Sequence, residues 1–227
     1  MVVASEGRIR AHDFWSQLPP ADAEELSARG LMREFRAGQA LCHEKQIPDR
    51  LLVLRTGRVK VTACSAVGRE IVLAFRGPGD LVGELSALDE EPRSATIVAL
   101  EPVSALALPY ADFRAFLAGH PAAALALLRL LAGRLRDADA KRIESTSATL
   151  ERIASRLVEL SDRFGEAEGE IALPISQQDL AGWAGASLEA VGRALRTMRG
   201  LGWIETRRRG IRVTDLEALR RAAEYAR

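Results

Sequence analysis

Between residues 30 and 108 the hydrophobic residues occur in short runs that turn residues interrupt. The clearest runs are residues 51–54, 59–61, 71–75, 95–100 and 103–108. Short strands separated by glycine-containing turns are typical of an antiparallel barrel or sandwich. Glycine adopts left-handed turn conformations without steric strain, and we expect such turns at Gly38, Gly57, Gly68 and Gly79.

The hydrophobic spacing becomes helical after Ala111. Leu128, Leu131, Leu135 and Ala138 recur at intervals of three and four residues, which is the spacing of a coiled-coil seam. The pattern predicts a long helix that pairs with a second copy of the chain through Leu128, Leu131 and Leu135. A helix that only packs on its own barrel is the alternative, but the pattern continues further than a barrel could cover.

A second amphipathic pattern follows the serine-rich break at residues 145–147, which we interpret as a hinge. Its apolar positions are Leu150, Ile153, Leu157 and Leu160. We therefore expect the α+β fold class. The predicted parts are a β-rich part over residues 1–120, a long helix and hinge over 121–147, and a mainly helical part over 148–227.

The segment from Ser176 onward has the pattern of two short helices joined by a tight turn. Ser176 is a suitable N-cap, and Asp179 follows three residues later as a capping-box partner. The first helix ends at Gly185, which favours a left-handed turn, and Ser187 caps a second helix over residues 188–199. This arrangement predicts a helix-turn-helix, whose second helix enters the major groove of DNA.

Basic residues gather in the same part of a nearly neutral chain, which has 32 Lys and Arg against 31 Asp and Glu. Residues 171–213 contain seven arginines and three acids, a local positive charge suited to phosphates. Arg207, Arg208 and Arg209 lie between two short β-like segments. We expect a β-hairpin with a basic tip there, the wing of a winged helix-turn-helix.

Three charged residues are spaced to share one face of the second helix, namely Glu189, Arg193 and Arg196. Arginine can donate to guanine O6 and N7, and glutamate can accept from cytosine N4. A surface ion pair between Glu189 and Arg193 is the alternative. Within a helix-turn-helix with a basic wing we favour base recognition. Further candidates for DNA contact are Gln177, Ser187 and Leu188.

A second cluster of candidate binding residues lies in the stretch GELSALDEEPRSAT. Gly83 leads into a short helix whose free backbone N–H groups can bind an anion. Arg93 offers a planar guanidinium and Ser94 a hydroxyl for a phosphate. Glu84 is an acceptor suited to a ribose hydroxyl. An ion pair of Arg93 with Glu84 or Glu91 is the alternative, and it would leave the site empty.

These two clusters, in this order and joined by a long helix, resemble the CRP/FNR family of transcription regulators from about Phe14 to Val213. The resemblance implies an N-terminal cyclic-nucleotide-binding β-roll, a dimerisation helix and a C-terminal winged helix-turn-helix. It identifies SLEAVGRAL with the recognition helix, in which Glu189 and Arg193 read bases. It predicts a phosphate-binding cassette with the ligand-binding residues Gly83, Glu84, Leu85, Arg93 and Ser94.

Some positions depart from the family pattern. Leu188 stands where the cyclic AMP receptor protein has a base-reading arginine, which predicts a different half-site. Asp137 and Ala138 stand where cyclic-AMP binders have hydroxyl residues. Because a carboxylate can accept from both N1–H and N2–H₂ of guanine, Asp137 adds cyclic GMP to cyclic AMP as a candidate ligand. An exposed Asp137 paired with Lys141 is the alternative.

The sequence leaves three functions open: a ligand-gated dimer that binds an inverted-repeat operator, a ligand-independent regulator, and a sensor of a non-nucleotide ligand. No catalytic motif follows the roll, which argues against an enzyme controlled by a cyclic-nucleotide domain. No cofactor is firmly implied beyond cyclic AMP or cyclic GMP, and RNA polymerase is a candidate partner. The apolar stretch at 122–132 is short and contains Arg129, so we expect no membrane span and a cytoplasmic protein.

Overall fold

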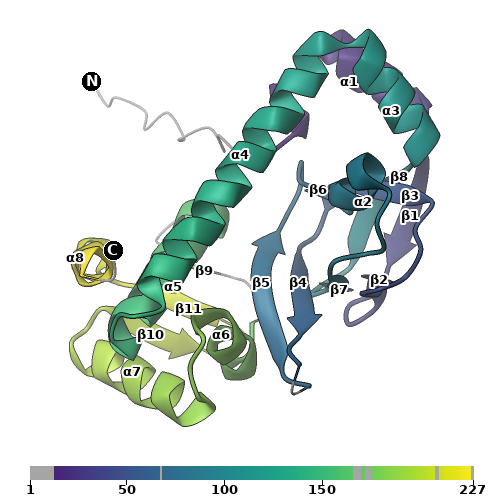
Figure 1. Cartoon of the computed structure of the whole chain (residues 1–227). Helices are drawn as coiled ribbons and strands as arrows, with labels where there is room; N and C mark the ends of the chain where they lie inside the picture. The colour runs from purple at the N-terminus through teal and green to yellow at the C-terminus, as the bar shows by residue number, and fades with distance from the viewer. Residues whose placement is uncertain (1–12, 67, 166–169, 172–174, 208–209, 226–227) are drawn as a thin grey trace, which may run out of the picture.

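The computed structural model describes residues 13–66, 68–165, 170–171, 175–207 and 210–225. Its N-terminal part is a β-roll, and one long helix leads from the roll to a smaller, mainly helical unit (Figure 1). The predicted α+β class and the predicted order of elements are confirmed.

Two four-stranded antiparallel sheets form the roll. The first has the order β1-β8-β3-β6 and comprises β1 (Leu31–Phe35), β8 (Val103–Pro109), β3 (Arg50–Thr56) and β6 (Leu81–Val82). The second has the order β2-β7-β4-β5 and comprises β2 (Ala40–Cys42), β7 (Thr96–Ala99), β4 (Val59–Cys64) and β5 (Glu70–Arg76). Each hydrophobic run predicted from the sequence overlaps one of these strands.

Apolar side chains from both sheets, such as Leu54 and Val59, are fully buried inside the roll. The predicted left-handed turns are confirmed, with φ between 73° and 88° at Gly38, Gly57, Gly68 and Gly79. Gly57 also needs to lack a side chain, because a Cβ there would lie 2.2 Å from the carbonyl oxygen of Pro102.

Helices cover the outside of the roll. The 3-10 helix η1 (Trp15–Gln17), α1 (Pro20–Ala28), α3 (Tyr110–Gly119) and the start of α4 (Pro121–Glu144) pack there. Phe14 and Phe113 meet edge to face, with ring centres 6.1 Å apart. In the described part of the chain no single helix is long and apolar enough to cross a membrane. Helices α3 and α4 satisfy that test only as a pair, and they are bent by 113°.

Helix α4 carries two apolar rows. The row that faces the roll is buried and consists of Ala123, Ala126, Leu127 and Leu130. On the other side Leu128 and Leu135 are 62% and 64% exposed. Leu131 differs from the predicted seam, since it is partly buried and packs against the core of its own roll. The exposed row follows instead the positions Leu125, Leu128, Ala132 and Leu135.

The C-terminal unit begins with α5 (Thr149–Phe164), after a break at residues 145–148 that agrees with the predicted one. Three further helices follow, α6 (Gln177–Ala184), α7 (Leu188–Gly200) and α8 (Leu216–Glu224). A small antiparallel sheet has the order β10-β11-β9 and comprises β9 (Glu170–Ile171), β10 (Ile204–Arg207) and β11 (Gly210–Val213).

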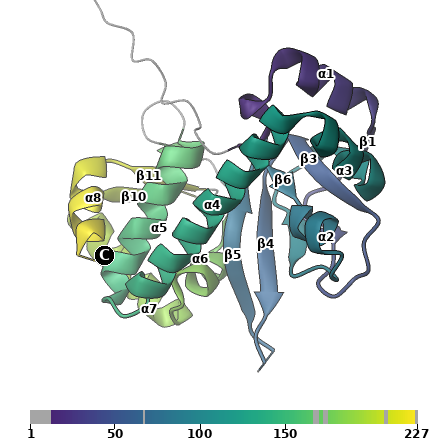
Figure 2. The same ribbon diagram turned by 45° about the horizontal axis from the view of Figure 1, so that its top comes forward.

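The roll and the C-terminal unit share a hydrophobic core. Val72 and Phe75 of β5 belong to the same buried cluster as Trp183 of α6. The rings of Phe75 and Trp183 meet edge to face at 4.8 Å. A Cβ on Gly182 would lie only 3.2 Å from the carbonyl oxygen of Glu70. Helix α6 therefore lies directly against β5, as Figure 2 shows.

Candidate ligand pocket and DNA-binding surface

A cavity of about 520 Å³ lies between β5, the short helix α2 (Glu84–Asp89) and α4. This volume falls in the usual range of small-molecule sites. The cavity is lined by all six residues predicted to bind a ligand: Gly83, Glu84, Leu85, Arg93, Ser94 and Asp137. Five of them come from the roll and one from the long helix, so the fold brings together residues that are distant in the sequence.

The Arg93 side chain is buried against backbone carbonyls. Its Nη1 donates to the carbonyl oxygen of Gly83 at 3.0 Å, and its Nη2 donates to that of Arg50 at 2.5 Å. These contacts replace the alternative ion pair with Glu84 or Glu91. Its Nε is buried without a hydrogen-bond partner among the described residues. A buried, unmatched donor on a guanidinium is suited to a phosphate oxygen.

Gly83 is held in a left-handed conformation with φ of 80° at the start of α2. A Cβ at this position would lie 1.9 Å from Nη1 of Arg93. The Tyr110 hydroxyl donates to the same Gly83 carbonyl oxygen at 3.2 Å. Glycine is therefore needed both for the backbone turn and for the position of the arginine.

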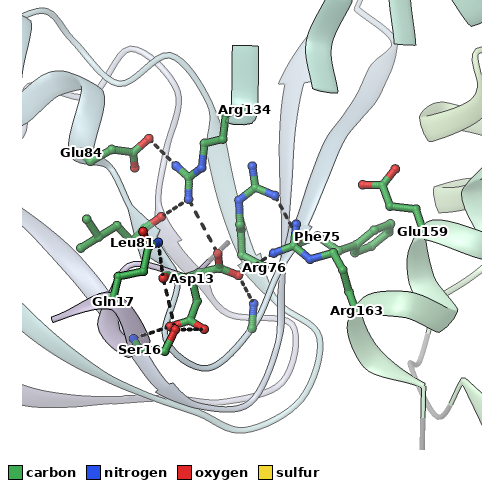
Figure 3. A network of polar contacts seen from close by, with 12 residues as sticks. Asp13, Ser16, Gln17, Phe75, Arg76, Leu81, Glu84, Arg134, Glu159 and Arg163 are labelled. Atoms are coloured by element: carbon green, nitrogen blue, oxygen red, sulfur yellow. Dashed lines mark hydrogen bonds and ion pairs between the residues drawn. The ribbon is translucent and has the colours of Figure 1, made fainter. Parts of the chain in front are cut away.

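Glu84, the predicted ribose acceptor, is only 4% exposed and pairs with Arg134 of α4 at 2.5 Å. Arg134 also donates to the carbonyl oxygen of Leu81 at 2.7 Å and lies 3.9 Å from Asp80 (Figure 3). The cassette is thereby tied to the long helix. The sequence did not single out Arg134, because nothing in its local pattern distinguishes it from the other arginines of α4.

The cavity ends against helices α4 and α6. Lys141 and Trp183 line it there, with the Lys141 ammonium 5.1 Å from the Trp183 ring centre. Lys141 pairs with Glu159 at 3.4 Å, so the alternative pairing with Asp137 is not formed. Trp183 is 6% exposed, and its Nε1 is buried with no partner in the described part of the chain. Trp183 is not among the residues that the sequence predicts for the pocket, although it lines the cavity.

The predicted helix-turn-helix is formed by α6 and α7. The Ser176 hydroxyl accepts from the Asp179 N–H at 3.0 Å, and the Asp179 carboxylate accepts from the Ser176 N–H at 3.0 Å. Gly185 turns the chain with φ of 60°. The Ser187 hydroxyl accepts from the Ala190 N–H at 3.2 Å and caps α7.

The exposed face of α7 carries the predicted base-reading residues Leu188, Glu189, Arg193 and Arg196. Glu189 and Arg193 form the ion pair of the alternative interpretation. Their side chains nevertheless remain 80% and 58% exposed, so both are accessible to a base edge. Gln177 lies beside this face, since a Cβ on Gly192 would be 3.9 Å from its Oε1 and 3.5 Å from Nη1 of Arg196.

The predicted wing hairpin is formed by β10 and β11, whose register runs from Ile204 opposite Val213 to Arg207 opposite Gly210. Arg199 of α7 donates to the Thr206 hydroxyl at 3.1 Å, which holds the hairpin beside α7. The predicted phosphate contacts Arg208 and Arg209 lie outside the described residues, as does the Arg207 side chain.

A roll with a ligand-sized cavity, joined by a long helix to a winged helix-turn-helix, defines the class of ligand-responsive DNA-binding regulators. Comparisons with known proteins agree with this class. Residues 32–120 match the family model of the cyclic nucleotide-binding domain, and residues 151–222 match that of the Crp-like helix-turn-helix domain.

The chain is 32% identical over 194 residues to the CRP-like cAMP-activated global transcriptional regulator of Mycobacterium tuberculosis, with 84% of this chain and 87% of the relative covered. It is also 32% identical over 191 residues to the cyclic AMP receptor protein of Thermus thermophilus, with 84% and 87% covered. FixK2 from Bradyrhizobium japonicum shares the fold, with a TM-score of 0.76 at 24% identity over 85% of this chain and 96% of that structure.

The chain belongs to the CRP/FNR family of transcription regulators. It is therefore a regulator that acts by binding DNA and not an enzyme.

We expect Gly83→Ala to destabilise the protein, because a methyl group would both strain the left-handed backbone and displace Arg93. Gly38→Ala is a matched control, since Gly38 has φ of 81° but a Cβ there meets nothing within 4 Å. The control should lose about 1–2 kcal/mol from backbone strain, and Gly83→Ala about 1–2 kcal/mol more. Urea unfolding measures both losses, and equal losses would contradict the role given to Gly83.

Proposed function

We propose that this regulator is a homodimer that binds an inverted-repeat operator and responds to a cyclic nucleotide bound in its roll. The observation that carries the proposal is one cavity lined both by Arg93, whose buried Nε has no partner among the described residues, and by Trp183 of the DNA-binding unit. A ligand held there has direct access to both functional parts of the chain.

Within this proposal residues 1–120 are the sensor domain, 121–147 the dimerisation helix with its hinge, and 148–227 the DNA-binding domain. The family matches to residues 32–120 and 151–222 support this division. We place the protein in the cytoplasm, where a DNA-binding regulator meets its operator.

Cyclic AMP is the first candidate ligand, because the names of both relatives refer to it. Cyclic GMP is the second, because Asp137 lines the cavity and is exposed, with no ion pair to any described residue. The competing function is a ligand-independent regulator. The contacts of Arg93 with carbonyls and of Glu84 with Arg134 favour it, since they complete much of the site without a ligand.

Ligand binding is tested by thermal unfolding with each cyclic nucleotide. At a hundred times its dissociation constant a ligand adds about 2.7 kcal/mol to stability. Arg93→Leu should abolish this gain, but it also removes two hydrogen bonds to carbonyls and should lower the stability of the free protein. Ser94→Ala is the milder variant, because Ser94 is exposed, and it should weaken binding with the free protein unchanged. A wild type that neither nucleotide stabilises would favour the ligand-independent function.

The dimer interface is proposed to follow the exposed apolar row of α4. Replacing both Leu128 and Leu135 by Asp would bury charges in a seam that excludes water, so we expect monomers in sedimentation and loss of operator binding. Ile47→Asp is the control, since Ile47 is 87% exposed and lies outside α4. A double variant that remains dimeric would rule out this interface.

The operator is proposed to have two half-sites one helical turn apart, about 34 Å, because a two-fold dimer presents two recognition helices. Arg193→Ala should flatten the preference at one base pair per half-site, by about 1–3 kcal/mol. Arg208→Ala should weaken binding to all DNA sequences alike. It should also make the logarithm of the binding constant less steeply dependent on the logarithm of the salt concentration, by about one unit of slope. Leu188 cannot donate a hydrogen bond, so the base pair that it contacts should show little sequence preference. Selection from randomised DNA measures these effects, and unchanged preference in Arg193→Ala would show that α7 does not read the bases.

A further inference from the structure

Arg76, at the end of β5, lines the ligand cavity without a carboxylate partner in the described part of the chain. Its hydrogen bond runs from Nη1 to the carbonyl oxygen of the adjacent Phe75 at 3.1 Å. Burial, followed by the charges of Arg134 and Arg163, lowers the pKa of Arg76 to about 10. A partly buried guanidinium without a counter-charge is unfavourable unless an anion joins it.

The carboxylates nearest to Arg76 are engaged with other arginines. Asp80 accepts from Arg163 of α5 at 2.8 Å, and Glu84 pairs with Arg134 of α4 at 2.5 Å. Figure 3 shows the three arginines converging from three elements. Three guanidinium groups therefore share two buried carboxylates, and Arg76 is the one that forms no direct ion pair with a described residue.

Lys141 is a second cation that lines the cavity. It lies over the Trp183 ring, and its partner Glu159, 3.4 Å away, is shared with Arg156 at 3.0 Å. Burial lowers the pKa of Lys141; Glu159 raises it, and the charges of Arg156 and Arg76 lower it further. The Lys141 ammonium and the Arg76 guanidinium belong to α4 and β5, and both residues line the cavity.

We propose that Arg76 and Lys141 form a second anion-binding subsite in the cavity, so that the preferred ligand is a nucleotide with two phosphates. This inference rests on the proposed nucleotide-binding function of the cavity. The first phosphate lies at the cassette beside Arg93, and the second lies between β5 and α4. A cyclic dinucleotide supplies both phosphates in one molecule, and a cyclic mononucleotide together with inorganic phosphate supplies the same chemistry from two.

The subsite borders the DNA-binding unit, because Lys141 contacts Trp183 of α6. An anion bound there therefore changes the charge next to the contact between the pocket and the helix-turn-helix.

Calorimetric titration of the full-length protein tests the subsite with three probes: cyclic di-GMP, cyclic AMP, and cyclic AMP with inorganic phosphate. Arg76→Met should lower the affinity for cyclic di-GMP by about ten- to a hundredfold, as expected for lost charge-assisted hydrogen bonds. It should lower the affinity for cyclic AMP alone by less than about threefold. Inorganic phosphate should raise the affinity of the wild type for cyclic AMP, but it should not raise that of Arg76→Met. Arg55→Met is the matched control, since the Arg55 guanidinium stacks on Trp15 at 4.1 Å and does not line the cavity.

Equal weakening of cyclic AMP and cyclic di-GMP by Arg76→Met, or no preference of the wild type for a second phosphate, would overturn the subsite. If no nucleotide binds the wild type, the proposed nucleotide function fails, and the subsite is tested alone with inorganic phosphate. Thermal stabilisation that Arg76→Met removes supports it, and no stabilisation overturns it. Because Arg76 forms no ion pair with a described residue, its loss should leave the melting temperature of the free protein equal or higher. A clear decrease would assign Arg76 to the fold instead.

Discussion

The packing of α6 against β5 determines how the ligand cavity is placed relative to the DNA-binding helices. Phe75 and Trp183 meet at 4.8 Å inside a core that contains residues of both units. The backbone of α6 can come this close because Gly182 has no side chain. Trp183 consequently belongs to two surfaces, the shared core and the wall of the cavity. It stands two residues before Gly185, where the helix-turn-helix turns toward α7.

A polar contact supports the same packing and shows why it is insensitive to pH near neutrality. Lys60 of β4 binds Asp179 of α6 at 2.7 Å. Burial raises the pKa of Asp179, but hydrogen bonds from Lys60 and Ser176 outweigh it, and the pKa lies below its ordinary value. Burial lowers the pKa of Lys60, but its hydrogen bonds to Asp179 and Glu70 raise it above the ordinary value. The pair therefore stabilises the packing from about pH 4 to about pH 10 and weakens only when Asp179 gains a proton in acid or Lys60 loses one in alkali.

Features that depend on local sequence could be predicted, and those that depend on packing between distant segments could not. The N-caps at Ser176 and Ser187 and the turn at Gly185 follow from the chemistry of neighbouring residues, and each agrees with the structure. The cassette was predicted because its residues are close in the sequence. Arg134 and Trp183 have no such local signal, since each reaches the cavity only through the way its helix packs on the roll.

Helix α4 shows the limit of periodicity alone. The predicted dimer seam passes through Leu131, whereas the exposed apolar row passes through Ala132. With 3.6 residues per turn, adjacent positions on a helix are separated by about 100°, and a helix that is apolar on two faces offers more than one consistent row. Only the roll, by covering Leu127 and Leu130, decides which leucines remain outside.

The position of the cavity also limits which ligands could control DNA binding. A ligand shifts an equilibrium between two arrangements only by the difference in its affinity for them. A molecule that touched the roll alone would bind equally well wherever the helix-turn-helix lay, and it would shift nothing. Arg134 and Lys141 of α4 and Trp183 of α6 also line the cavity, so a ligand that reaches them distinguishes the arrangement in which α6 rests on β5 from any in which it does not. By thermodynamic reciprocity, operator DNA that prefers one arrangement must change the affinity for such a ligand by the same factor.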